Sequence, residues 1–283
     1  MMDTRERHQA FKEARLGPLT LRNRTIKAAT FEGMTDGNIV HPELIEFHRR
    51  MAAGGVGMTT MAYIGVSADG RGTPNELVPE RSHESDLRRL ADAVHAEGAA
   101  LSGQIGHAGA VAASAGLKGL SPSRVFSPLA LRRTQAMQAD DFPRVREAFC
   151  ETARRLVGCG FDAIEIHLGH GYLLSEFMSP RLNRRRDEWG GSLENRARFP
   201  RQVVEAVREA VGPDVALLAK LNMADGVAGG LWLDESVEAA KLLESDGALD
   251  AIELTAGSSL QNPMYMFRGE APISEMAQAF PRA

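Results

Sequence analysis

The sequence of 283 residues has few cysteines, few aromatic residues, no large excess of charge of one sign and no long apolar run. Its two cysteines are Cys150 and Cys159. If both lie on one helix, the helix separates them by about 13.5 Å, which is too far for a disulfide bond. A chain without disulfides is typical of a reducing compartment, so we expect a cytoplasmic protein.

The balance of charge excludes one large class of function. The chain has 33 basic and 37 acidic residues, with a formal net charge of -4 at pH 7, and the basic residues are spread along the sequence. Such a chain lacks the basic patch that binds nucleic acid, and we expect no nucleic acid as a partner. No apolar run reaches the length of about 20 residues that spans a bilayer. The charged segment 1–8 lacks the apolar core of a secretory signal, so we expect no membrane partner.

Strand-like and helix-like segments alternate along the chain. Short apolar runs predict strands, amphipathic runs predict helices, and the Gly-rich, Ser-rich segment 106–139 predicts a long irregular loop over a site. The predicted strands are 25–29, 56–63, 99–105, 161–167, 215–221 and 251–254, and the predicted helices are 42–53, 85–97, 140–159, 194–211 and 233–245. This alternation predicts βαβ units and a parallel sheet.

Two parallel architectures fit that alternation, an open doubly wound sheet and a closed barrel. No G-x-G-x-x-G follows the first strand, and polar residues follow several different strands, namely His41, Gln104, His167 and Lys220. That distribution favours a TIM (β/α)8-type α/β barrel, which we predict as a single domain over residues 1–283. About six of the eight units are recognisable, and after Ala256 we expect only a loop and a short helix over 274–280. We therefore expect an incomplete barrel, which is a fragment, a truncated variant or a chain that another subunit closes.

The groups best suited to chemistry follow the fourth predicted strand. His167, His170 and Tyr172 lie within six positions, directly after an apolar run. Imidazoles bind anions and move protons, and a phenol keeps its proton at neutral pH. Taken alone, the two histidines also fit a structural pair or a metal pair. The spacing supplies no third ligand, so we expect no metal and predict an active site at this strand end.

A longer pattern surrounds these three residues and resembles the old yellow enzyme family of FMN-dependent ene-reductases and NADH:flavin oxidoreductases. Its main part is His167-x-x-His170-Gly171-Tyr172-Leu173-Leu174, Phe177, Ser179-Pro180, Asn183-x-Arg185-x-Asp187, Gly190-Gly191-Ser192-x-Glu194-Asn195-Arg196-x-Arg198-Phe199. Matching pieces lie in order along the chain, at Leu21-x-Asn23-Arg24-x-Ile26, 57–63, Gln104-Ile105-Gly106-His107-Ala108-Gly109 and Lys220-Leu221-Asn222. The resemblance covers nearly the whole chain.

The resemblance implies a TIM barrel that holds FMN noncovalently at the carboxyl ends of its strands. NAD(P)H reduces the flavin, and a small-molecule substrate, an activated alkene or a related electrophile, reoxidises it. By position, the residues implied at the flavin are Ala28, Ala29 and Thr30 through their backbone, Tyr63 at the ring edge, Gln104 at the pyrimidine, His167, and Lys220 near N1 and O2. The sequence does not distinguish NADH from NADPH, and a homo-oligomer is compatible with it.

The same resemblance implies catalytic roles for His167, His170 and Tyr172. His167 and His170 match the pair that holds a carbonyl or nitro oxygen of the substrate and polarises it. Tyr172 matches the proton donor to the substrate α-carbon. Together they predict an oxyanion site and an acid.

The chain also departs from the family. It has Ala28-Ala29-Thr30-Phe31 where many members carry Pro-Met or Ser-Pro, and it lacks the cysteine cluster of an iron–sulfur centre. The half of the FMN site that binds phosphate would lie beyond Ala283. Two other hypotheses follow: a catalytically impaired truncated barrel that binds flavin weakly or needs a partner, and a Schiff-base lyase that uses Lys220.

The incomplete barrel generates a first prediction. Unpaired edges on the first and sixth strands would leave backbone donors and acceptors open to other chains. We expect the chain expressed alone to have low stability and to aggregate, as measured by size-exclusion chromatography and thermal unfolding. A reversible, cooperative melt of a monomer at high temperature would contradict this expectation.

Overall fold

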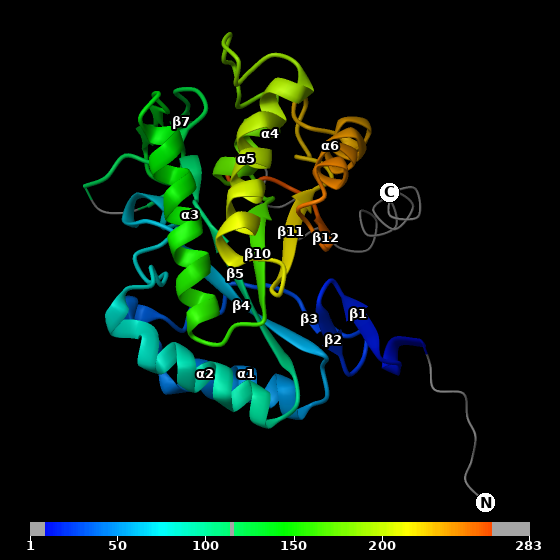
Figure 1. The fold of residues 1–283 in the computed structure, drawn as a ribbon. Helices are drawn as coiled ribbons and strands as arrows, with labels where there is room; N and C mark the ends of the chain where they lie inside the picture. Colours follow the sequence, from blue (N-terminus) through cyan, green and yellow to red (C-terminus); the bar gives the residue numbers. More distant parts are fainter. Residues whose placement is uncertain (1–8, 114–115, 262–283) are drawn as a thin grey trace, which may run out of the picture.

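A curved sheet of six parallel strands forms the centre of the fold, which we describe from a computed structural model over residues 9–113 and 116–261 (Figure 1). Every pair of neighbours in the sheet is parallel. The strands are β3 (Ile26–Lys27), β4 (Met58–Gly65), β5 (Ala100–Gly106), β10 (Ala163–Leu168), β11 (Ala216–Asn222) and β12 (Ala251–Thr255). Strands β4, β5, β10 and β11 are almost wholly buried, and β12 is half-buried.

Helices connect the successive strands of this sheet. They are α1 (Pro42–Ala53), α2 (Glu84–Ala96), α3 (Asp141–Gly158), α4 (Leu173–Met178), α5 (Leu193–Val211) and α6 (Leu233–Asp246). Helix α1 packs on α2 and α3 packs on α5, so that the larger helices form a layer outside the sheet (Figure 1). Short 3-10 turns lie at Gln9–Phe11, Asp36–Asn38, Ala68–Gly70, Arg81–His83 and Gly109–Val111.

The order of the strands decides between the two parallel architectures. Across the sheet the order is β12-β11-β10-β5-β4-β3, so each strand lies beside the next strand of the sheet along the chain. A doubly wound sheet reverses its strand order at one point, whereas a (β/α)8 barrel does not. The described residues therefore confirm the predicted TIM-type α/β fold, with six parallel strands. That residues 1–283 form one domain stays a prediction, and the predicted helix over 274–280 lies outside the described residues.

The structure adds short elements that the sequence did not predict. The segment 106–139, predicted to be irregular, contains a parallel pair, β6 (Leu120–Ser121) with β9 (Gln135–Ala136), and an antiparallel pair, β7 (Phe126–Ser127) with β8 (Arg132–Arg133). Residues 14–21 form a hairpin of β1 (Ala14–Leu16) and β2 (Leu19–Leu21), where the sequence predicts only a short extended piece over 16–21. Helix α4 was missed because six buried residues are too few to show a helical period.

An ion pair and several hydrogen bonds hold the loop between α4 and α5. Arg185 lies 2.6 Å from Asp187 and also donates to the carbonyls of Pro122 and Met137. Because these carbonyls belong to the 106–139 segment, Arg185 ties the two loops together. The side chain of Ser192 accepts a hydrogen bond from the amide of Asn195 and begins α5.

An aromatic cluster holds α3, α4 and α5 against one another. The ring of Phe199 on α5 is fully buried, and its centroid lies 5.0 Å from Phe142 on α3 and 5.0 Å from Phe177 on α4. Trp189 stacks on Phe142 at 4.3 Å. These edge-on and stacked rings fix the helix layer behind β10, the strand that carries the predicted site.

Replacing Phe199 with alanine should lower the free energy of unfolding by about 3–5 kcal/mol, because it leaves a cavity between three helices. Urea unfolding followed by circular dichroism measures the change. Leu129→Ala is the matched control, since Leu129 is 58% exposed and its truncation should change stability by less than about 0.5 kcal/mol. Equal effects of the two substitutions would show that the cluster does not hold the helix layer.

Candidate active site

A row of polar side chains crosses the inner face of the sheet over four strands. Gln104 on β5 lies opposite Glu165 on β10, and Lys220 on β11 lies opposite Glu253 on β12. Gln104 Nε2 donates to Glu165 Oε1 at 2.6 Å, and Lys220 Nζ lies 3.5 Å from the same oxygen and 2.9 Å from Glu253 Oε1. We call these four residues the polar row. Gln104 and Lys220, predicted from separate motifs, therefore meet through Glu165.

Burial sets the protonation of the polar row. Glu165 is 1% exposed, and this burial, with the neighbouring Glu253, raises its pKa to about 8 although Lys220 opposes the shift. The pKa of Glu253 is lowered; its own burial opposes this shift, and contacts with Glu165 and Lys220 produce it. At neutral pH, one proton is therefore held on the two carboxyls, mainly on Glu165, and Glu253 carries the charge that balances Lys220.

The two predicted imidazoles and the predicted phenol lie together above this row. His170 Nδ1 lies 3.3 Å from His167 Nε2, and the two ring centroids are 5.0 Å apart. The Tyr172 ring lies 4.7 Å from the His167 ring and 5.3 Å from the ring of Tyr63. The structure thus brings His167, His170 and Tyr172 into one cluster, next to Tyr63 from β4.

The backbone at His170 is in an unusual conformation. Its φ of 59° lies in the left-handed region, which costs free energy for a residue with a side chain. Two hydrogen bonds hold it there: His170 Nε2 contacts Thr255 Oγ1 at 2.6 Å, and the His170 carbonyl accepts from the amide of Ser259 at 2.8 Å. A side chain at the next residue, Gly171, would collide with Ser258. The turn after β10 therefore packs against the end of β12 and the residues that follow it, 258–259.

Desolvation keeps all three groups neutral near pH 7. Burial, with the nearby charge of Lys220, lowers the pKa of His170 to about 4, and burial likewise lowers the pKa of His167 well below its usual range. Burial raises the pKa of Tyr172, and the carboxyl of Glu76 adds to that shift. The amide of Gly169 donates to His167 Nδ1 at 3.3 Å, so the ring hydrogen of neutral His167 is on Nε2, which faces His170.

The remaining predicted residues lie along the same strand ends. Tyr63 is buried at a register shift between β4 and β5, and its hydroxyl lies 3.5 Å from the carbonyl of Gly70. The carbonyl of Ala29 lies 3.4 Å from Lys220 Nζ, while Ala28 and Thr30 beside it are exposed. His41 is used elsewhere, since its ring contacts the carbonyl of Asp36 in the loop before α1.

Several site residues were not predicted from the sequence. Glu165 is a lone carboxyl in a wholly buried apolar strand, a signal that could have been recognised. Two more buried acids are Glu76 and Glu176; burial raises the pKa of Glu76 to about 7 and raises that of Glu176 well above its usual range. Thr255 and Glu253 follow from no local pattern, since their importance depends on which strand lies beside β11.

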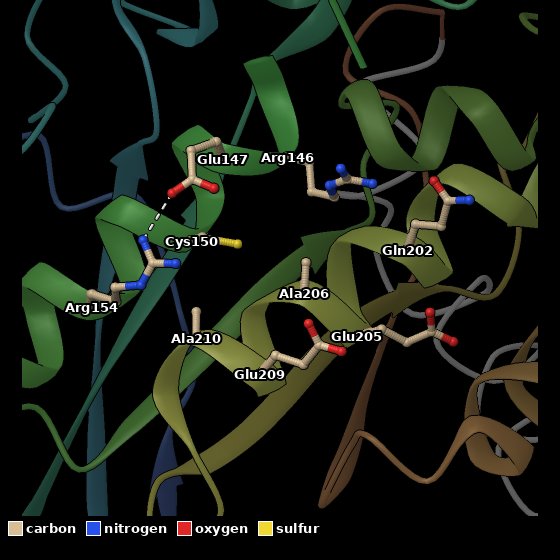
Figure 2. A pocket seen from close by; sticks show the side chains of 9 residues that line it. All are labelled: Arg146, Glu147, Cys150, Arg154, Gln202, Glu205, Ala206, Glu209 and Ala210. Carbon is tan, nitrogen blue, oxygen red and sulfur yellow. Dashed lines mark hydrogen bonds and ion pairs between the residues drawn. The ribbon is translucent and has the colours of Figure 1, made fainter. Parts of the chain in front are cut away.

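A groove lies on the outer helix layer, between α3 and α5 (Figure 2). Its lining is largely charged and comprises Arg146, Glu147, Cys150, Arg154, Gln202, Glu205, Ala206, Glu209 and Ala210. None of the predicted site residues lines it. Over residues 9–113 and 116–261 we find no cluster of three potential metal ligands, and none of the helices there has the length and apolarity needed to cross a membrane.

The protonation of His170 generates a prediction. Its pKa is about 4 in the folded chain and 6.5 in the unfolded chain, so the unfolded chain binds more protons as the pH falls from 6.5 towards 4. Stability should decrease over this window, by up to about 3 kcal/mol for this one group. His170→Asn should remove that part of the decrease, as measured by urea unfolding at several pH values. A variant with the parent's pH dependence would show that His170 is not held neutral.

Comparison with known proteins places this arrangement in a family. The sequence model of the NADH:flavin oxidoreductase / NADH oxidase family matches residues 9–261. The 4,4'-dithiodibutanoate disulfide reductase of Rhodococcus erythropolis is 53% identical over 283 residues, which are 99% of this chain and 70% of that protein. The NADH oxidase of Thermoanaerobacter brockii is 34% identical over 254 residues, and the match spans 87% of this chain but 39% of the relative.

Solved structures agree with the sequence comparisons. A 2-naphthoyl-CoA reductase in complex with 2-naphthoyl-CoA superposes with a TM-score of 0.84 at 30% identity, over 89% of this chain and 41% of that one. An old yellow enzyme homologue from Zymomonas mobilis has the same fold, with a TM-score of 0.80 at 24% identity over 89% of this chain and 74% of its own. The predicted resemblance is confirmed: the chain belongs to the NADH:flavin oxidoreductase / NADH oxidase family, the old yellow enzyme family of FMN-dependent NAD(P)H oxidoreductases.

Proposed function

We propose that this chain binds FMN over the polar row and uses NAD(P)H to reduce a small electrophile held by His167 and His170. The observation that carries the proposal is the cluster of two neutral imidazoles and a protonated phenol directly after β10. FMN, when bound, supplies the hydride transfer between NAD(P)H and the electrophile. The residues of the chain supply orientation, charge and a proton.

The donor set of the polar row fits the polar edge of a flavin. The pyrimidine ring of a flavin offers carbonyl and ring-nitrogen acceptors and one N–H donor. Gln104 has an amide that both donates and accepts, and Lys220 supplies a cation, held at the site by Glu253. The carbonyl of Ala29 lies 3.4 Å from Lys220 Nζ, and the backbone of Ala28, Ala29 and Thr30 would contact the ring. Among the described residues we assign no side chain to the FMN phosphate.

The histidines would hold an oxygen of the substrate. The Nε2 hydrogen of His167 points to His170 Nδ1, and Thr255 Oγ can donate to or accept from His170 Nε2. When Thr255 donates, the hydrogen of neutral His170 moves to Nδ1, and both rings then present N–H groups to the same point. Two donors on one carbonyl or nitro oxygen stabilise the charge that develops on it when a conjugated alkene is reduced.

Tyr172 would supply the proton that completes alkene reduction. Its phenol keeps the proton because burial and the neighbouring Glu76 raise its pKa. The ring packs against Tyr63 and His167, so the position of the hydroxyl is fixed by two aromatic contacts. This geometry supports the assignment of Tyr172 as the acid and His167 with His170 as the oxygen-binding pair.

A second substrate class follows from the relative in Rhodococcus erythropolis. That protein is a 4,4'-dithiodibutanoate disulfide reductase, and it aligns with 99% of this chain. Reduction of a disulfide consumes one NAD(P)H and one proton and yields two thiols, so the same site could supply the proton from Tyr172. We propose a small disulfide as the alternative electrophile to an activated alkene.

Two further hypotheses have less support in the geometry. Schiff-base chemistry needs a free amine, whereas Lys220 lies in ion pairs with Glu253 and Glu165. A catalytically impaired barrel that binds flavin weakly, or only with a partner or a second copy, differs from the leading proposal in its affinity for FMN. Both are separated from it by the experiment below.

The purified chain mixed with FMN should quench flavin fluorescence, become yellow and oxidise NAD(P)H when an activated alkene or 4,4'-dithiodibutanoate is added. Tyr172→Phe should lower alkene reduction about 100-fold, the usual contribution of a general acid, and leave FMN binding unchanged. Unchanged alkene reduction in this variant would exclude Tyr172 as the donor. A chain that stays colourless would favour the impaired barrel, and borohydride trapping of a carbonyl compound on Lys220 would favour the lyase.

A further inference from the structure

Glu165 occupies a position in the site that the proposed roles do not explain. Its Oε1 atom lies 2.6 Å from the amide nitrogen of Gln104 and 3.5 Å from the ammonium of Lys220. These are the two side chains proposed to contact the flavin pyrimidine, and they come from strands on either side of β10. One carboxyl therefore sets the positions of both.

The polar row holds one carboxyl more than its cation requires. Lys220 is the ammonium in the row, and Glu165 and Glu253 both lie within ion-pair distance of it. With both carboxyls ionised, the row would carry a net negative charge against a site for an electron-rich ring, in a region shielded from water. With one proton shared by the two carboxyls, the row is neutral overall.

We propose that Glu165 is a positioning residue that orients Gln104 and Lys220 towards FMN and that the proton it shares with Glu253 is required for tight FMN binding. The inference rests on the proposed function, since it concerns the same FMN site. The charged groups that face Glu165 are Lys220 on β11 and Glu253 on β12, and the group that faces it from β5 is the neutral amide of Gln104. His170, which lies near Glu253, is neutral above pH 6.

The sign of the pH dependence follows from this arrangement. Burial raises the pKa of Glu165 to about 8, so raising the pH through this value removes the shared proton. The added negative charge lies beside the flavin carbonyls and competes with them for the ammonium of Lys220 and the amide of Gln104. FMN affinity should therefore fall as the pH rises through about 8.

The test is a titration of the full chain with FMN, followed by quenching of flavin fluorescence, at pH values on both sides of 8. The parent should bind FMN more weakly at high pH than at low pH. The loss should be about tenfold for each unit by which bound FMN raises the pKa of the shared proton. Glu165→Gln keeps an acceptor for Gln104 and cannot ionise, so it should bind as the parent does at low pH and lose its pH dependence. Glu253→Gln should also lose the pH dependence, because the one remaining carboxyl, when ionised, only balances the charge of Lys220. Glu165→Leu should bind FMN weakly at every pH, since Gln104 loses its partner.

Glu176→Gln is the matched control, because Glu176 is another fully buried carboxyl with a raised pKa, held by the amide of Ala110 rather than by the row. It should keep the parent's pH profile. A Glu165→Gln variant that keeps that profile, or a parent affinity that does not change with pH, would overturn the inference and leave the proposed function standing.

A second readout does not need FMN. Infrared spectra of the FMN-free chain at neutral pH should contain a protonated-carboxyl band that Glu165→Gln loses and Glu176→Gln keeps, apart from the band of Glu176 itself. If that band persists in Glu165→Gln, Glu165 does not hold the proton and the inference fails. If the parent shows the band but binds no FMN, the proposed function fails and takes with it the assignment of the row to FMN.

Discussion

The ion pair between Lys220 and Glu253, with the protonated carboxyl of Glu165 beside it, is the interaction on which the rest of the site depends. The ammonium of Lys220 and the carboxyl of Glu165 are both almost fully buried, and the charge of Glu253 and nearby dipoles replace the hydration that the ammonium has in water. Their pairing requires β10, β11 and β12 to lie in one register, because a slip of one residue would turn each side chain to the opposite face. The charges of the polar row thus favour one register of β10, β11 and β12 at the proposed active site.

The same burial explains why neutral groups dominate the cluster above the row. His167 and His170 lie in a region that already contains the cation of Lys220, and a second positive charge there would be costly. Neutral imidazoles can each donate one hydrogen and accept another, whereas imidazolium ions only donate. Burial therefore keeps both rings able to donate a hydrogen bond to a substrate oxygen. Gly169 contacts the other ring nitrogen of His167, and Thr255 contacts that of His170.

Much of this could be predicted from the sequence because the signals were local. The apolar run before His167, the spacing of His167, His170 and Tyr172, and the strands that carry Gln104 and Lys220 are all recognised within short windows. The structure brings these residues to one end of one sheet. The boundaries of α1 were predicted to the residue because Pro42 begins the helix and Gly54 follows it. The fold class followed from the alternation of strands and helices.

What could not be predicted depends on contacts between distant segments. Thr255 is 85 residues from His170, and nothing near it in the sequence marks it as a partner of an imidazole. Glu253 pairs with Lys220 only because β12 lies beside β11. The short strands of 106–139 form from pairs of residues whose register is set by side-chain bonds such as that between Ser121 and Thr134, and such short elements have no period to recognise.

Strand β12 connects the edge of the sheet to the chemistry at its centre. It is half-buried along its length, and it supplies both the carboxylate that balances Lys220 and the hydroxyl that holds His170. The local dielectric constant at Glu253 therefore depends on how much water reaches this strand. Any surface that covers β12 would exclude water from Glu253, strengthen its attraction to Lys220 and so change the acidity of the proton in the row.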